Sequence, residues 1–138
     1  MRILIVDDHL EHGEALAELL ISRGHEAYFA PNAVEAEWLF SLFRFDLSVI
    51  DFDMPDENGS EVALRLLAHS PQSEAVIMSA HRPGEIPPEA LRGLPFFPKP
   101  IELKSLLEFL EKFLLRKSGA PLAVRESYPL QKLDRESK

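Results

Sequence analysis

Residues 49–59 read VIDFDMPDENG, a stretch that places four carboxylates and a glycine directly after an apolar run. The run Leu47–Ile50 has the continuous apolar character of a strand that is covered on both faces, as strands of parallel sheets are. A carboxylate at the end of such a strand is costly unless it is hydrogen-bonded, paired with a cation or bound to a metal. This end of the strand is therefore expected to be open to water or to carry a cation.

Further apolar runs and helical patterns alternate on both sides of that stretch. Short apolar runs predict strands at residues 2–6, 26–29, 46–50, 75–79 and 94–97. Apolar residues at helical spacing predict helices at residues 11–23, 33–43, 60–69 and 101–116. This alternation implies an α/β fold in which a parallel sheet carries helices on both faces.

The alternation breaks between the fourth and fifth predicted strands. Residues 83–100 contain six prolines, and a proline inside a helix costs about 3 kcal/mol. We expect a loop over His81–Pro87 and at most two helical turns around Glu89–Arg92. The fourth helix of the fold is thus predicted to be shortened or irregular.

Length and composition restrict the class of protein. The chain has 138 residues, which suits one folded domain, and a formal net charge of -8, which argues against non-specific binding to nucleic acid. It has no cysteine, so it has no disulfide and no thiolate metal site. No apolar run approaches the roughly 20 residues that span a bilayer, and the apolar N-terminal run is too short for a signal peptide. We expect a cytoplasmic protein without a direct nucleic-acid or membrane partner.

Polar residues follow the predicted strands at one edge of the sheet. Ligands of parallel sheets bind beyond the carboxyl ends of the strands. The residues at those ends are Asp7 and Asp8, Asp51, Ser79 and Lys99. The acidic stretch after the third strand is therefore interpreted as part of a site.

The carboxylates at this edge match the ligand preference of a hard cation. Mg²⁺ prefers oxygen ligands in octahedral geometry and keeps several waters. Asp8 and Asp51 could bind it directly, with the backbone carbonyl of Asp53, while Asp7 holds a water. A metal, a lysine and a hydroxyl around one aspartate suit phosphoryl transfer, because each can neutralise charge on the transferred group.

Several short motifs carry a resemblance to a known family. In chain order they are Asp7-Asp8, Asp51 followed by Met54-Pro55 and Gly59, Ser79-Ala80, and Lys99-Pro100. Over about residues 2–116 the chain resembles the receiver domain of two-component response regulators. The resemblance implies a flavodoxin-like three-layer sandwich whose five-stranded parallel sheet has the order 2-1-3-4-5.

The resemblance also implies roles for the residues at the strand ends. Asp51 is the implied phosphoacceptor, Asp7 and Asp8 are the acidic pair that binds Mg²⁺, and Lys99 pairs with the phosphate. The implied donor is a phosphohistidine on a histidine kinase or a histidine phosphotransfer protein. The downstream protein is not identified by the sequence, and a homodimer is left open.

Other residues are assigned to switching and to the lifetime of the phosphoryl group. By the resemblance, Ser79 is the switch hydroxyl, the backbone of Ala80 binds phosphate, and Phe96 stands at the position of the switch aromatic. Asp53 and His81 lie two residues after the acceptor and two after the serine. We expect this pair to flank the path of attacking water, and we favour a shielding pair that slows the attack.

The remaining polar and aromatic residues receive structural interpretations. We expect Asp56, Glu57 and Asn58 to form a solvated loop before a helix, where acids are favourable. His9 is expected near the rim of the site, whereas His12, His25 and His69 are expected on the surface. Trp38 is expected to pack on the sheet.

Two other functions are open to the same sequence. Asp51-Phe52-Asp53 also resembles the D-x-D of haloacid-dehalogenase-type phosphatases, but that family has its motifs in the opposite order and a Gly-Thr that this chain lacks. A receiver fold that binds partners without being phosphorylated is the second alternative. The preferred prediction is a stand-alone receiver domain at residues 1–117 that is not an enzyme in its own right, followed by a tail at residues 118–138 that is too short for an output domain.

Overall fold

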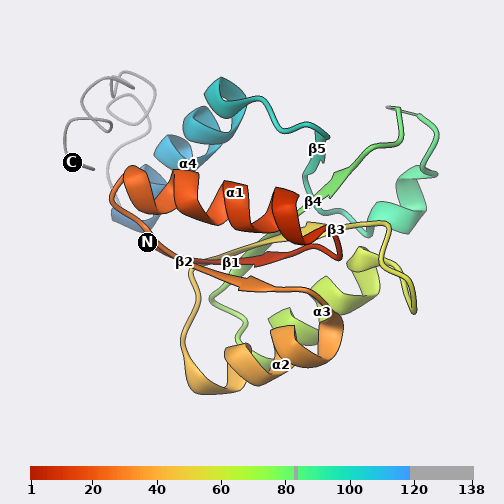
Figure 1. Cartoon of the computed structure of the whole chain (residues 1–138), viewed down its shortest axis with the longest axis horizontal. Helices are drawn as coiled ribbons and strands as arrows, with labels where there is room; N and C mark the ends of the chain where they lie inside the picture. The colour runs from red at the N-terminus through yellow and green to blue at the C-terminus, as the bar shows by residue number, and fades with distance from the viewer. Residues whose placement is uncertain (83, 119–138) are drawn as a thin grey trace.

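The computed structural model describes residues 1–82 and 84–118, which form a three-layer α/β sandwich (Figure 1). The five strands are β1 (Arg2–Val6), β2 (Glu26–Ala30), β3 (Leu47–Asp51), β4 (Glu74–Ser79) and β5 (Phe96–Pro98). All neighbouring strands pair in parallel, and their order across the sheet is β2-β1-β3-β4-β5. The predicted fold class and strand order are confirmed.

Helices cover both faces of this sheet (Figure 1). They are α1 (Leu10–Ser22), α2 (Ala33–Leu42), α3 (Gly59–His69) and α4 (Leu103–Ser118). On one face, α1 and α4 pack over Ile3 and Ile5 of β1, and on the other α2 and α3 pack over Leu4 and Val6. Successive side chains of a strand point to opposite faces, so one continuous apolar run supplies both halves of the core.

Local capping fixes where two of the helices begin. The side chain of Asn32 accepts a hydrogen bond from the backbone N–H of Glu35 at 2.8 Å, and Asn58 accepts one from Glu61 at 3.1 Å. Such caps satisfy N–H groups that have no partner within the helix. Asn58 therefore fixes the start of α3 eight residues after the acidic strand end, and it is more than a residue of a solvated loop.

In the described residues of the connection between β4 and β5, the only helical element is a short 3-10 helix, η1 (Pro88–Leu91). Arg92 follows it in the left-handed region at φ 55°, and the backbone N–H of Leu94 bonds back to the carbonyl of Leu91 at 3.0 Å. The predicted short, irregular fourth helix is confirmed. The fifth strand begins at Phe96, not at Leu94 as predicted, because Leu94 closes the turn that ends η1.

Two side-chain predictions were wrong. Trp38 is 61% exposed on the outer face of α2, whereas Ala36 and Phe40 of the same helix face the core. His25 is only 8% exposed, and its Nδ1 lies 3.3 Å from the amino group of Met1. Most of the predicted tail, from residue 119 on, lies outside the described residues.

None of the helices in the described part of the chain combines the length and the apolar character that crossing a membrane requires.

Candidate functional site

Four of the predicted site residues meet at the carboxyl edge of the sheet. Asp7 follows β1, Asp51 is the last residue of β3, Ser79 is the last residue of β4, and Lys99 follows β5. Asp7 and Asp51 are each 1% exposed and Ser79 is fully buried. The parallel register brings together side chains that lie up to 92 positions apart in the sequence.

Lys99 lies between two buried carboxylates. Its Nζ donates to Oδ2 of Asp7 at 2.9 Å and to Oδ2 of Asp51 at 3.2 Å. The remaining carboxylate oxygens accept backbone N–H groups, from His9 to Asp7 at 2.9 Å and from Asp53 to Asp51 at 3.0 Å. One ammonium group is therefore shared by two carboxylates, so their charge is only partly compensated.

The pKa values of the three groups follow from this sharing. Burial acts to raise the pKa of Asp7, but the His9 N–H and Lys99 outweigh it and hold that pKa below its ordinary value. Burial raises the pKa of Asp51, and the Asp53 N–H and Lys99 offset this only in part. Burial acts to lower the pKa of Lys99, yet the bond to Asp7 and the charge of Asp51 keep it raised. Asp51 is thus the carboxylate that most needs a further cation.

The acidic groups are close enough to share one metal ion. One ligand atom from each of Asp7, Asp8, His9 and Asp51 lies within 4.8 Å of the others. Three carboxylates against one lysine leave two negative charges uncompensated, and the donors are mostly oxygen, which suits Mg²⁺. The residues present therefore fit the predicted ion, whereas the part assigned to the Asp53 carbonyl stays a prediction.

Gly59 allows α3 to start directly against the strand end that carries Asp51. A Cβ at this position would lie 2.2 Å from the carbonyl oxygen of Asp51, and its backbone N–H donates to the carbonyl of Phe52 at 2.9 Å. Real Cβ atoms do not approach a backbone oxygen so closely, so only glycine fits without a shift. Gly59 thus helps to position the predicted acceptor, Asp51.

A second polar group lies beside the first and includes the predicted switch serine. The Ser79 hydroxyl donates to Oδ2 of Asp53 at 2.7 Å, and Nε2 of His81 lies 2.9 Å from Oδ1 of the same carboxylate. The backbone N–H of His81 donates to the Ser79 hydroxyl at 3.1 Å. Asp53 therefore binds both the serine and the histidine, and their roles remain predictions.

The other two predicted residues, Ala80 and Phe96, come from the end of β4 and from β5. Ala80 is exposed directly after β4. Phe96 pairs with Ile77 in the sheet and is partly buried against the core on the α2–α3 face. Both residues belong to the β4–β5 region, and the phosphate-binding role of the Ala80 backbone and the switching role of Phe96 stay predictions.

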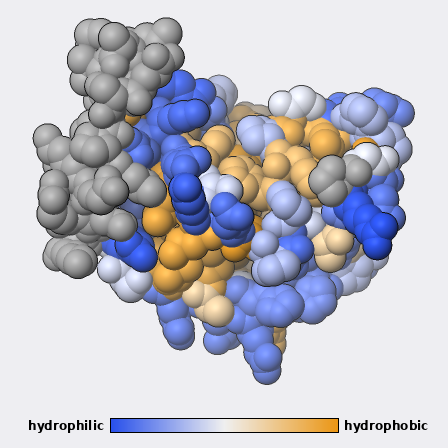
Figure 2. Space-filling view, turned by 90° about the horizontal axis from the view of Figure 1, so that it is seen from above, coloured by the Kyte–Doolittle hydropathy of each residue, from blue (hydrophilic) through white to orange (hydrophobic). Residues whose placement is uncertain are grey.

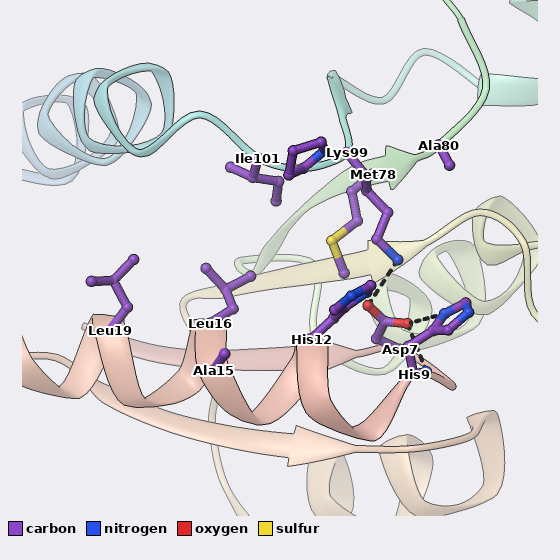
Figure 3. Close-up of a pocket in the computed structure, with 11 residues that line it drawn as sticks. Asp7, His9, His12, Ala15, Leu16, Leu19, Met78, Ala80, Lys99 and Ile101 are labelled. Carbon is purple, nitrogen blue, oxygen red and sulfur yellow. Dashed lines mark hydrogen bonds and ion pairs between the residues drawn. The ribbon is translucent and has the colours of Figure 1, made fainter.

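An apolar cavity of about 650 Å³ opens next to the carboxylates. It lies between α1, β4 and the segment after Lys99, and its apolar wall includes Leu16, Leu19 and Ile101 (Figure 3). Asp7 and Lys99 form its polar end. Figure 2, which looks down on the face that carries α1 and α4, shows an apolar area in the middle of that face.

Sequence reasoning missed two features near the site. Arg65 holds Glu57 through both its terminal nitrogens and donates to Glu37 at 2.9 Å, so Glu57 is not a freely solvated loop residue. The rings of His9 and His12 stack at 5.4 Å beside Asp7. The H-x-x-H spacing immediately after the acidic pair was the available signal, because residues three apart are neighbours on a helix.

Comparison with known proteins agrees with this geometry. Residues 3–111 match the family model of the response regulator receiver domain. A response regulator receiver protein of Anaeromyxobacter sp. (strain Fw109-5) is 35% identical over 109 residues, which are 78% of this chain but only 46% of that relative's length. Sporulation initiation phosphotransferase F of Bacillus subtilis is 28% identical over 86% of this chain and 97% of its own.

Solved structures of response regulator proteins are also similar to this chain. The response regulator protein TrrA of Thermotoga maritima, in complex with Mg²⁺-BeF, superposes with a TM-score of 0.71 at 28% identity, over 81% of this chain and 97% of its own. TrrA has also been solved in complex with the histidine kinase ThkA, with the same TM-score and identity over 82% of this chain. The family match covers most of the chain, so this protein belongs to the response regulator receiver domain family of two-component signalling.

Proposed function

We propose that Asp51 accepts a phosphoryl group from a phosphohistidine donor and that the resulting aspartyl phosphate is the signalling state of residues 1–117. The observation that carries this proposal is the position of Asp51. It is buried at the end of β3, 3.2 Å from the Lys99 ammonium, and grouped with the carboxylates of Asp7 and Asp8. A carboxylate with a raised pKa beside a lysine is poised to act as a nucleophile.

The step requires few groups from the protein. A carboxylate oxygen of Asp51 attacks phosphorus, the P–O bond forms, and the P–N bond of the phosphohistidine breaks with its electron pair on the imidazole nitrogen. Lys99 is close enough to follow the phosphoryl oxygens as charge moves away from the carboxylate, and Ser79 is the nearest buried hydroxyl on the neighbouring strand.

Asp7, Asp8 and Asp51 are the residues that would hold Mg²⁺. When bound, the ion supplies positive charge that neutralises oxygens of the transferred group. Its removal would leave the carboxylates to repel an incoming phosphate. The complex of TrrA with Mg²⁺-BeF supports the assignment of the same ion here.

Switching is proposed to begin at Ser79. Its hydroxyl donates to Asp53, so it must leave Asp53 before it can donate to a phosphoryl oxygen. The backbone N–H of Ala80 is then proposed to bind the phosphoryl group beside it. Because His81 is bonded to both Ser79 and Asp53, the exchange would move the start of the β4–β5 connection, with Phe96 behind it.

The donor is proposed to dock over the apolar cavity along α1. Leu16, Leu19 and Ile101 offer an apolar surface that ends at Lys99 and Asp7, so a helix lying there would bring its histidine to the acceptor. The complex of TrrA with ThkA supports a histidine kinase as the partner class. Leu16→Gln is expected to slow phosphotransfer from a competent kinase and to leave labelling by acetyl phosphate unchanged.

The proposed chemistry is tested by labelling with acetyl phosphate and Mg²⁺, followed by mapping of the acid-stable and base-labile phosphate. The wild type should be labelled at Asp51, EDTA should abolish the labelling, and Asp51→Asn should not be labelled. Asp56→Asn is the matched control, because Asp56 is an exposed acid five residues away and should not alter labelling.

Two outcomes would contradict the proposal. Labelling of Asp51→Asn equal to that of the wild type would remove Asp51 as the acceptor. Sustained turnover of a phosphomonoester, with many phosphates released per protein, would support the phosphatase alternative, whereas a receiver releases only the phosphate that it has accepted.

A further inference from the structure

A pair of histidines lies against the carboxylates at the start of α1, outside the set that the proposed phosphorylation uses. His9 precedes the first residue of α1 and His12 lies three positions further on. Their rings stack at 5.4 Å between centroids, and one ligand atom from each of Asp7, His9 and His12 lies within 4.8 Å of the others. Figure 3 shows the two imidazoles on either side of the Asp7 carboxylate.

The distances in this group approach those of a tetrahedral metal site. Zinc bonds of about 2.0–2.1 Å to nitrogen and oxygen place the ligand atoms of a tetrahedron roughly 3.3 Å apart. Within the group, His9 Nδ1 lies 3.3 Å from Oδ1 of Asp7. The same nitrogen also lies 3.3 Å from Oδ1 of Asp8, which is outside the group. A ligand atom of His12 lies within 4.8 Å of those of Asp7 and His9, and His12 is exposed, so a side-chain rotation can bring it closer.

The charge and the donor types favour a cation other than Mg²⁺. The three carboxylates of the edge exceed the single positive charge of Lys99, so the potential around His9 and His12 attracts cations. Imidazole nitrogen suits zinc, nickel and copper ions, whereas Mg²⁺ selects oxygen. Both histidines are solvent-accessible, which leaves a path for an ion to enter.

We propose that His9, His12 and Asp7 form a second metal site, selective for zinc-class divalent cations, with the fourth coordination position open to water. Because Asp7 belongs both to this site and to the proposed Mg²⁺ site, the two metals compete. Occupation by zinc would therefore block Mg²⁺-dependent phosphorylation of Asp51, a consequence that rests on the proposed function.

Metal binding is tested first, without any phosphorylation. Zinc affinity is measured on the full chain of 138 residues by competition with a chromogenic chelator, for the wild type, His12→Gln and His69→Gln. His12→Gln should weaken zinc binding by about tenfold or more, since even groups that only orient a ligand are worth 10–100-fold. His69→Gln, an exposed histidine at the far end of α3, should leave it unchanged. Equal zinc affinity in the wild type and His12→Gln would overturn the site.

Two further readouts separate this site from zinc held at the Mg²⁺ carboxylates alone. Mg²⁺ affinity should stay within about twofold in His12→Gln, because a hard cation gains little from imidazole. Co²⁺ bound to the wild type should show visible absorption bands typical of tetrahedral nitrogen and oxygen ligation, and His12→Gln should lose them. Identical spectra from the two proteins would overturn the assignment of His12 as a ligand.

The competition is tested last. Micromolar zinc should inhibit acetyl phosphate labelling of the wild type at low Mg²⁺, and His12→Gln should resist it at the same zinc concentration. Asp51→Asn should fail to be labelled yet bind zinc within a few-fold of the wild type. If neither the wild type nor His12→Gln is labelled by acetyl phosphate in the absence of zinc, but zinc binding still depends on His12, the proposed function fails and the metal site stands. If zinc inhibits both proteins equally, the competition through this site is refuted.

Discussion

Two connections leave the same edge of the sheet and are built in opposite ways. The β3–α3 connection, residues 52–58, is short, ends in the Asn58 cap and is pressed against the Asp51 carbonyl through Gly59. The β4–β5 connection, residues 80–95, is long, and apart from residue 83, which is not described, it contains only the 3-10 turn η1 and has Ile86 as its buried apolar residue.

The difference suggests that the first connection holds the acceptor in place, whereas the second can change its conformation. The first connection holds the acceptor strand end by backbone contacts that leave no room for change. In its described residues, the second is joined to the site through the Ser79–Asp53–His81 hydrogen bonds and to α3 by an exposed ion pair, Arg92–Glu61 at 2.9 Å. Its apolar contact with the core includes Leu91 and Leu94, which are only partly buried. Segments with few buried contacts open at low free-energy cost. The second connection is therefore the part that phosphorylation is expected to move.

The largest effect should separate Gly59, the first residue of α3, from Gly93 of the β4–β5 connection. Gly59→Ala places a Cβ 2.2 Å from the Asp51 carbonyl oxygen, and we expect a loss of about 3 kcal/mol or more in the free energy of unfolding. Gly93→Ala meets no atom within 4 Å and is affected only by its positive φ of 79°, which costs about 1 kcal/mol. Urea denaturation of both variants measures the difference. Equal losses would show that the two connections are equally constrained.

The next largest effect is the loss of stability at low pH that His25 causes at the opposite edge of the sheet. It adds to any comparison of the two connections that is made at low pH. Burial and the nearby amino group of Met1 lower the pKa of His25 to about 4. Between pH 6.5 and 4 the unfolded chain binds a proton that the folded chain does not, so stability is complete above pH 6.5 and falls as the pH decreases. At pH 4.5 the loss should be about 2.5 kcal/mol.

Chemical denaturation from pH 7 to 4.5 tests this dependence. His25→Gln should remove most of the slope, and His69→Gln should keep it, because His69 is exposed. An unchanged slope in His25→Gln would assign the acid sensitivity to other groups.

A smaller effect is expected from the acceptor itself, in the opposite direction to an ordinary core substitution. The pKa of Asp51 is raised chiefly by burial, so its ionised form at neutral pH destabilises the fold. Stability from this group is present at low pH and is lost as the pH rises through its folded pKa. Asp51→Asn should therefore raise the stability in EDTA at pH 7.5 by about 1 kcal/mol, as relief of partly compensated buried charge often does. A decrease in melting temperature would contradict this assignment.

The smallest effect should concern the lifetime of the phosphoryl group. Asp53 and His81 are paired at 2.9 Å. We expect this pair to shield the aspartyl phosphate from attacking water, so Asp53→Asn and His81→Ala should each speed decay of labelled Asp51. We expect about two- to tenfold, well below the 10²–10⁴ of full acid–base catalysis. His69→Ala is the control. If both variants decay at the wild-type rate, the pair does not tune the lifetime.

Much of the site could be predicted from the sequence because its residues directly follow apolar runs that are visible in the sequence. Buried parallel strands are visible as apolar runs, and the residues that end them must meet at one edge, which is how Asp7, Asp51 and Lys99 come together. The six prolines of residues 83–100 similarly predicted the loss of a regular fourth helix.

The rest depends on three-dimensional details that spacing does not contain. The sequence pattern could not reveal that the Ser79 hydroxyl donates to Asp53. Nor could the pattern reveal that the amino group of Met1 lies next to the ring of His25. In α2 the apolar residues Val34, Trp38 and Leu42 form an exposed stripe, so periodicity could not decide which side of the helix meets the sheet.

Backbone amide NMR with and without Mg²⁺ and beryllofluoride, the group held by TrrA, tests most directly whether the signal leaves through the β4–β5 connection. We predict the largest shift changes at His81, whose N–H donates to the Ser79 hydroxyl, and over residues 84–97, with α2 nearly unchanged. In Ser79→Ala, changes near Asp51 should persist while those over residues 84–97 disappear. Shift changes that stay within residues 51–59, and that are the same in Ser79→Ala, would contradict it.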